Sequence, residues 1–313
     1  MSQVSGPKAP RALGAERSSG AKVAHWAAMR RAQVTAVTVR AGVGVLEAAS
    51  PPLAGAAVER LWFRPPRASA AAMRRHADLL ADAEPLSLRV NGREVRGWTL
   101  GEGPQVLLVH GWGGWAAQLA PIAHALASSG VAASAVDLPA HGSDPVRRTD
   151  AFESAAALRA LAADRGAPAL IVAHSFGALA AALAFQHDPP PAAVLLAPAL
   201  STTAAIARFG QMLRLRPATV DDLQARLERY TGDAWPLINR GADFAWPGGP
   251  LLVIHDRDDP QTPFALSAAL AARRSDVDLL EVSGSGHYRL LRDPEIVRVV
   301  ARFAADHMAA QRA

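Results

Sequence analysis

The chain has 313 residues, of which 50% are hydrophobic, so it can bury a sizeable core in one large domain or two smaller ones. Its formal net charge is only +5, and no long basic run is interleaved with aromatic residues, so we expect no nucleic-acid partner. The absence of cysteine excludes disulfides, thiolate metal sites and a cysteine nucleophile, and it favours a cytoplasmic location.

The N-terminal part of the chain is predicted to precede the main domain. Residues 1–22 are rich in Ser, Gly, Pro and charge, which is typical of a disordered tail. Residues 23–84 form a predicted helical leader, and Pro65-Pro66 stops its first helical stretch. Arg40 and Glu47 interrupt its most apolar stretch, so no integral membrane segment is predicted. We expect the leader to cover the main domain, with a homodimer contact or a membrane surface as alternatives.

The pattern changes to strands after Pro85. Asn91-Gly92 joins two alternating runs into a predicted β-hairpin. Short, wholly apolar runs separated by helical patterns then predict a mostly parallel, roughly eight-stranded sheet with helices on both faces, an α/β fold. The two parts of this core are residues 85–198 and 249–313, and residues 199–248 form a predicted helical cap or lid. The apolar runs are 105–109, 131–136, 169–173, 193–197, 250–254 and 277–282.

One strand of the predicted sheet runs directly into a helix through Ala-His-Ser-Phe-Gly, residues 173–177. This is the nucleophile-elbow pattern, in which a strained turn pushes the serine hydroxyl outward. The residues two before and two after the serine crowd each other, and Ala173 and Gly177 are both small. We therefore predict Ser175 as the nucleophile, at a helix N-terminus that favours developing negative charge. The alternative is an ordinary helix N-cap serine.

The strand at 105–109 ends in His-Gly-Trp-Gly-Gly, whose glycines allow the backbone to turn tightly. Here the sequence resembles the α/β-hydrolase superfamily. The resemblance implies that the amides of Trp112 and Phe176 form an oxyanion hole. The loop Asp137-Leu-Pro-Ala-His-Gly-Ser resembles another motif of the superfamily and implies a structural role for Asp137 and His141. His141 is an alternative candidate for the base.

The same resemblance implies the other two members of a catalytic triad. The family pattern Gly-x-x-Asp-x-x-x-Pro, aligned on Pro263, identifies Asp259 as the acid, with Asp258 and then Asp256 as alternatives. His287 follows a glycine after the last predicted strand, where the family places its base. The chain order Ser, Asp, His is that of this fold.

The leader end Trp-Phe-x-Pro-Pro, with Gly-Trp-Gly-Gly and Ala-His-Ser-Phe-Gly, resembles a bacterial subgroup of esterase-like serine hydrolases. We therefore expect a serine hydrolase that cleaves carboxylic esters of small to medium apolar acyl groups through an acyl-enzyme, with no metal and no cofactor. Trp112, Trp235 and Trp246 are the candidate substrate contacts. The alternatives are other chemistry on the same triad (acyl transfer, thioester or amide hydrolysis, C–C cleavage, perhydrolysis) and a non-catalytic, membrane-associated binding protein.

Overall fold

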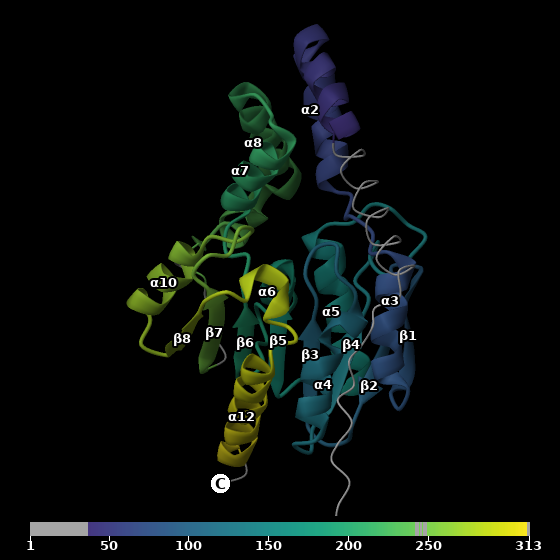
Figure 1. The fold of residues 1–313 in the computed structure, drawn as a ribbon, viewed down its shortest axis with the longest axis vertical. Helices are drawn as coiled ribbons and strands as arrows, with labels where there is room; N and C mark the ends of the chain where they lie inside the picture. The colour runs from purple at the N-terminus through teal and green to yellow at the C-terminus, as the bar shows by residue number, and fades with distance from the viewer. Residues whose placement is uncertain (1–36, 242–243, 245, 247–248, 312–313) are drawn as a thin grey trace, which may run out of the picture.

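The computed structural model describes residues 37–241, 244, 246 and 249–311, so the predicted tail at 1–22 lies outside the described residues. Its centre is an eight-stranded sheet of order β1-β2-β4-β3-β5-β6-β7-β8 (Figure 1). β1 and β2 form the predicted hairpin and β2 pairs antiparallel with β4, whereas all the other pairs are parallel. The strands are β1 (Glu84–Val90), β2 (Arg93–Leu100), β3 (Gln105–Val109), β4 (Ala132–Val136), β5 (Leu170–His174), β6 (Ala193–Leu196), β7 (Leu251–Asp256) and β8 (Val277–Val282).

Helices cover both faces of the sheet, which confirms the fold class predicted from the apolar runs. On one face, Leu107 and Val109 of β3 pack with α5, α6 and α10, and on the other, Val106 and Leu108 pack with α4 and α12. Successive residues of a strand point to opposite faces, so a wholly apolar strand supplies both cores. The helices are α2 (Pro51–Trp62), α3 (Ala70–Ala77), α4 (Ala120–Ala127), α5 (Ala151–Arg165), α6 (Phe176–Ala184), α7 (Thr202–Leu213), α8 (Pro217–Thr231), α9 (Trp235–Ile238), α10 (Phe264–Arg273), α11 (Gly286–Arg289) and α12 (Pro294–Ala310).

The segment between β6 and β7 carries α7, α8 and α9. It is the segment predicted as a lid and is called the lid below, and the leader packs on it. Residues 37–49 are helical, continue past Ser50 into α2, and extend from the same end of the molecule as α7 and α8 (Figure 1). A separate hydrophobic cluster joins the two parts, with Val43, Val58 and Phe63 from the leader and Ile206, Leu223 and Leu227 from the lid. Residues 37–62 of the leader therefore pack on α7 and α8.

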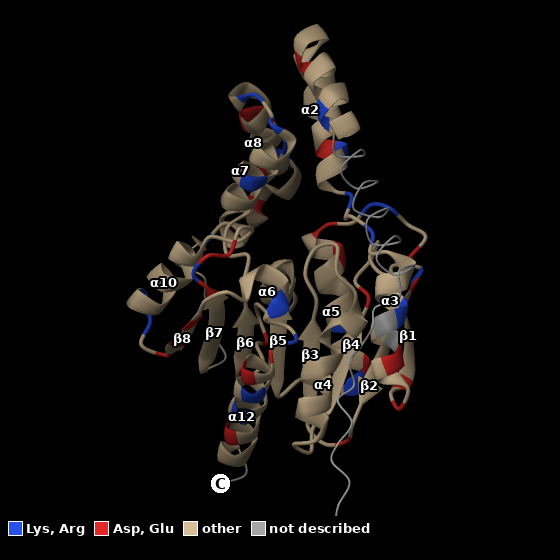
Figure 2. Ribbon diagram, in the orientation of Figure 1, with Lys and Arg blue, Asp and Glu red and all other residues tan. Residues whose placement is uncertain are grey.

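Polar contacts reinforce the packing between leader and lid. The buried carboxylate of Glu47 accepts a hydrogen bond from the backbone N–H of Arg216, which precedes α8, at 2.9 Å. Arg226 of α8 pairs with Glu59 of α2 at 3.3 Å. Figure 2 shows that basic and acidic residues are interspersed over the ribbon, including the leader and the lid.

The end of the leader turns back onto the core. The carbonyl oxygen of Phe63 accepts from the N–H of Thr149 at 3.1 Å, and Pro66 packs so closely on Gly113 that a Cβ there would lie 2.6 Å from the proline ring. Farther on, His76 of α3 meets the ring of Trp115 edge-on at 5.2 Å. The leader thus touches both the lid and the loop after β3. Among the described helices, none is long and apolar enough to cross a membrane.

Candidate active site

Ser175 lies at the sharp turn between β5 and α6, where its backbone adopts φ 52° and ψ −121°. A positive φ is costly for a residue with a side chain, on the order of 1–3 kcal/mol, so the surrounding packing must hold it. The serine is the N-cap of α6, yet its side chain makes no capping hydrogen bond. In an ordinary N-cap serine, the side-chain oxygen accepts a hydrogen bond from a backbone N–H of the first helical turn. The hydroxyl of Ser175 is free for another partner.

The turn can form only because its neighbours are small. A Cβ on Gly177 would lie 2.7 Å from the carbonyl oxygen of Val109, closer than real Cβ atoms approach a backbone oxygen. A Cβ on Gly111 would lie 3.0 Å from the Cβ of Ser175. Two glycines from different motifs therefore let the loop after β3 pack directly against the serine turn.

The structure brings together the three residues predicted for the triad. His287 Nε2 lies 3.0 Å from Ser175 Oγ, and His287 Nδ1 lies 2.7 Å from Asp259 Oδ2. Because an ionised carboxylate can only accept a hydrogen bond, the imidazole hydrogen belongs on Nδ1. Nε2 is then an acceptor, and the hydroxyl of Ser175 donates to it.

The alternatives for the acid and the base take other positions. Asp256 accepts from the N–H of Asp258 at 2.9 Å and from that of Gly286 at 2.6 Å, so its carboxylate joins the loop after β7 to the loop that carries His287. His141 is buried beside Trp112, with ring centroids 5.2 Å apart, and its Nδ1 contacts the carbonyl of Pro139. Asp259, not Asp256, is the carboxylate at His287 Nδ1, and His287, not His141, is the imidazole at Ser175 Oγ.

The side chain of Asp259 is completely buried, yet its surroundings favour the charged form. Burial by itself raises the pKa of a carboxyl group, but the neighbouring imidazoles of His255 and His287 outweigh burial and lower the pKa of Asp259 well below its ordinary value. The backbone N–H groups of Gln261 and Thr262 also donate to Oδ1, at 2.7 Å and 3.1 Å. The carboxylate beside His287 is therefore ionised at neutral pH.

The two residues predicted to supply the oxyanion amides, Trp112 and Phe176, contact each other through their rings. Phe176 is the first residue of α6, and its ring meets that of Trp112 edge-on at 5.0 Å. Neither amide donates to an acceptor among the described residues. The loop before Trp112 is held by His110, whose Nε2 accepts from the N–H of Leu138 at 3.0 Å while its Nδ1 lies 2.9 Å from the carbonyl oxygen of Gly111. Burial lowers the pKa of His110 to about 4, so this link stays neutral.

Two histidines at the site were not identified from the sequence. The Nε2 of His174, next to the serine, contacts the carbonyl oxygen of His287 at 2.9 Å, and burial lowers the pKa of His174 to about 3. His255, at the end of β7, lies with its Nε2 3.5 Å from Asp259 Oδ2. Each stands inside or beside a recognised motif, but nothing in the linear pattern shows which way its ring points.

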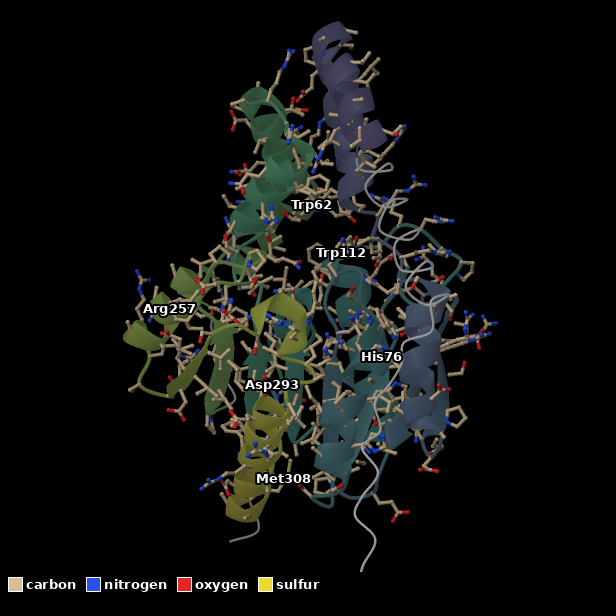
Figure 3. The ribbon with its side chains drawn as sticks, viewed as in Figure 1. Trp62, His76, Trp112, Arg257, Asp293 and Met308 are labelled. Atoms are coloured by element: carbon tan, nitrogen blue, oxygen red, sulfur yellow. The ribbon has the colours of Figure 1, made fainter. Side chains whose placement is uncertain are left out.

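The three tryptophans predicted to contact substrate have different surroundings. Trp112 is half-buried next to the serine turn, and Trp235 is half-buried where the lid meets the core. In the view of Figure 3, Trp62 at the end of α2 lies above Trp112, and its ring meets that of Phe209 of α7 edge-on at 5.4 Å. Trp246 is 1% exposed, and its Nε1 donates to the carbonyl of Pro190, which precedes β6. The structure places Trp246 in the core at the amino end of β6, whereas Ser175 follows the carboxyl end of β5, so we correct the prediction that Trp246 contacts substrate.

The comparison with known proteins agrees with this fold. A family model described as the alpha/beta hydrolase family matches residues 106–299, so the chain belongs to that family. A pimeloyl-[acyl-carrier protein] methyl ester esterase of Chromobacterium violaceum is 40% identical over 83 residues, which are 26% of this chain and 32% of that protein. The chain therefore matches less than two thirds of the length of this relative.

Solved structures show the same architecture. An esterase of Pyrococcus furiosus superposes with a TM-score of 0.58 at 18% identity, over 79% of this chain and 97% of its own. Est1E from Butyrivibrio proteoclasticus superposes with a TM-score of 0.54 at 18% identity, over 72% of this chain and 99% of its own. At these identities the likeness establishes the fold.

Proposed function

We propose that the chain is a serine hydrolase that cleaves a carboxylic ester of a small to medium apolar acyl group, with Ser175, His287 and Asp259 as its triad. The observation that carries the proposal is the continuous contact from Ser175 Oγ to His287 Nε2 at 3.0 Å and from His287 Nδ1 to Asp259 Oδ2 at 2.7 Å. A hydroxyl is a weak nucleophile until a base within hydrogen-bond reach can take its proton. This geometry meets that requirement.

In the first half of the reaction, Ser175 Oγ attacks the ester carbonyl carbon and its proton passes to His287 Nε2. Asp259 stabilises the resulting imidazolium and keeps its ring oriented. The amides of Trp112 and Phe176 donate to the tetrahedral oxyanion, and the loss of one such donor is worth roughly 3–4 kcal/mol of transition-state stabilisation. The ester C–O bond then breaks, and the leaving alkoxide takes the proton from His287, so that an acyl-enzyme and a free alcohol remain.

In the second half, water replaces the alcohol. Its proton passes to His287 Nε2 as its oxygen attacks the acyl carbon. The tetrahedral intermediate collapses, Ser175 regains its proton from His287, and a carboxylic acid leaves. Water, a thiol or an amine can each accept the acyl group on this geometry, so product analysis with competing nucleophiles separates hydrolysis from acyl transfer.

The aromatic residues around the serine support an apolar acyl group. Trp112 and Phe176 meet edge-on next to the predicted oxyanion amides, and Trp62 meets Phe209 of the lid edge-on at 5.4 Å. Apolar side chains from two parts of the chain favour a hydrocarbon acyl chain over a charged one. The relatives above include a methyl ester esterase and an esterase, which supports cleavage of an ester bond.

The test is labelling of the purified protein with a fluorophosphonate probe, followed by turnover of p-nitrophenyl esters of increasing chain length. We expect wild type to be labelled, Ser175→Ala to be unlabelled, and the matched control Ser283→Ala, an exposed serine in a nearby loop, to be labelled as wild type. Folded wild-type protein that is neither labelled nor active on any acyl ester would refute the proposal.

A further inference from the structure

The Asp259 carboxylate has more hydrogen-bond donors around it than its partnership with His287 requires. Oδ1 accepts the N–H groups of Gln261 and Thr262, while Oδ2 faces His287 Nδ1 at 2.7 Å and the hydroxyl of Thr262 at 3.0 Å. An imidazole and a hydroxyl therefore share one oxygen atom. Each donor withdraws some of the negative charge that would otherwise stabilise the imidazolium of the base.

A second imidazole also faces that oxygen. His255 is completely buried, and its Nε2 lies 3.5 Å from Asp259 Oδ2 and 3.2 Å from Thr262 Oγ1. The distance to the carboxylate is long for a hydrogen bond, so the shorter route runs through the threonine hydroxyl. On the other side of the ring, Nδ1 lies 2.8 Å from the hydroxyl of Ser267 in α10.

The nearby carboxylate favours one tautomer of His255. The carboxylate can only accept, so an attractive contact requires the hydrogen on Nε2. Nδ1 is then the acceptor, and Ser267 donates to it. A hydroxyl from α10 therefore orients the second imidazole toward the carboxylate, as Asp259 itself orients His287.

We propose that His255 is a positioning residue that shares the Asp259 carboxylate with His287, directly and through Thr262, and so limits how strongly this carboxylate stabilises the protonated base. The inference rests on the proposed function, because it assigns His287 as that base. Removal of His255 leaves more negative charge for His287. The base then holds its proton to higher pH, and the acidic limb of the activity profile moves upward.

Other titratable and charged groups also lie around His287 and His255. His174 stays neutral because burial lowers its pKa to about 3, and its ring lies 4.7 Å from that of His287. Arg257 stands over Phe264, which faces His255, and its guanidinium pairs with Glu281. Asp256 accepts from the N–H of Gly286, next to His287, and the ring of Tyr288 lies 4.9 Å from that of His287. Arg289 belongs to the same short helix as His287, and its side chain contacts the carbonyl oxygens of Gly284 and Ser285.

The experiment measures the second-order rate of fluorophosphonate labelling of Ser175 against pH in wild type, His255→Leu and His255→Gln. The Leu side chain has no donor, whereas the Gln amide can place an N–H near the position of Nε2. We expect the acidic midpoint of His255→Leu to rise by about half to one pH unit, and that of His255→Gln to stay near wild type. Equal midpoints in all three, or a slower rate at every pH without a shift, would overturn the inference.

Since His255 is completely buried, its replacement by Leu could prevent folding. In that event Thr262→Val and Thr262→Ser are compared in the same assay, because only Thr262→Val removes the hydroxyl that links His255 to Asp259. We expect the acidic midpoint to rise in Thr262→Val and to stay near wild type in Thr262→Ser, and equal midpoints would overturn the inference. The two proposals fail in different ways. Folded wild type that is not labelled at any pH refutes the proposed function and this inference with it, whereas labelling with unshifted midpoints in the variants refutes only the role of His255.

Discussion

Lowering the pH from 7 to 5 should destabilise this protein strongly, because three histidines are buried in neutral form. Burial lowers the pKa of His110 to about 4 and the pKa values of His141 and His174 to about 3. In the unfolded chain an imidazole has a pKa of about 6.5. Between these values the unfolded state binds more protons than the folded state, so stability is present above pH 6.5 and is lost as the pH falls.

The size of the effect follows from the two pKa values of each group. At pH 5 the unfolded imidazole is almost fully protonated and the folded one is almost neutral, which removes about 2 kcal/mol of stability per histidine relative to pH 7. Counted independently, the three remove about 6 kcal/mol, a large share of the 5–15 kcal/mol that a typical domain has. Burial raises the pKa of Asp137, and this one group acts in the opposite direction at low pH.

The assay is urea unfolding at pH 7 and pH 5, followed by circular dichroism. His174→Gln keeps an N–H donor for the carbonyl of His287 and cannot titrate, so its loss of stability between the two pH values should be smaller than that of wild type by about 2 kcal/mol. His187→Gln, at an exposed histidine, is the matched control. The reasoning fails if wild type loses less than about 2 kcal/mol, or if His174→Gln loses as much as wild type.

Two further substitutions test the packing that holds the site. Gly177→Ala should destabilise the fold by roughly 1–3 kcal/mol and slow labelling of Ser175, because its Cβ would meet the carbonyl of Val109; unchanged melting and labelling would contradict this. Val58 has no exposed surface, so Val58→Ala should weaken the packing free energy between leader and lid by roughly 2 kcal/mol. Proteolysis of the leader should then be faster than in wild type. Val45→Ala, at a residue that is 67% exposed, is its control, and equal proteolysis of the two variants would show that the cluster does not hold the leader.

The amino-acid sequence by itself determined the sheet and the places where chemistry could occur. A wholly apolar run such as 105–109 can be stable only when both of its faces are covered, so its local composition already specifies a central parallel strand. The serine turn could be located for a similar reason. The turn leaves no room for large side chains two residues before and two residues after Ser175, because backbone atoms nearby and on the neighbouring strand lie too close. Ala173 and Gly177 are small for this reason, and both can be identified in the sequence.

Only the tertiary structure decided contacts between segments that are far apart in the chain. Asp258 and Asp259 are adjacent acids in one loop, and the choice between them depends on which carboxylate reaches His287. The sequence places Trp246 in the predicted lid, where we expected it to contact substrate, but the fold buries it against Pro190. The leader's apolar residues fit a sheet face or a lid equally well, because hydrophobic burial has no direction of its own. The direction in which a side chain points depends on how the whole domain packs. Only the folded structure therefore shows that His255 faces the Asp259 carboxylate and that the leader packs on the lid.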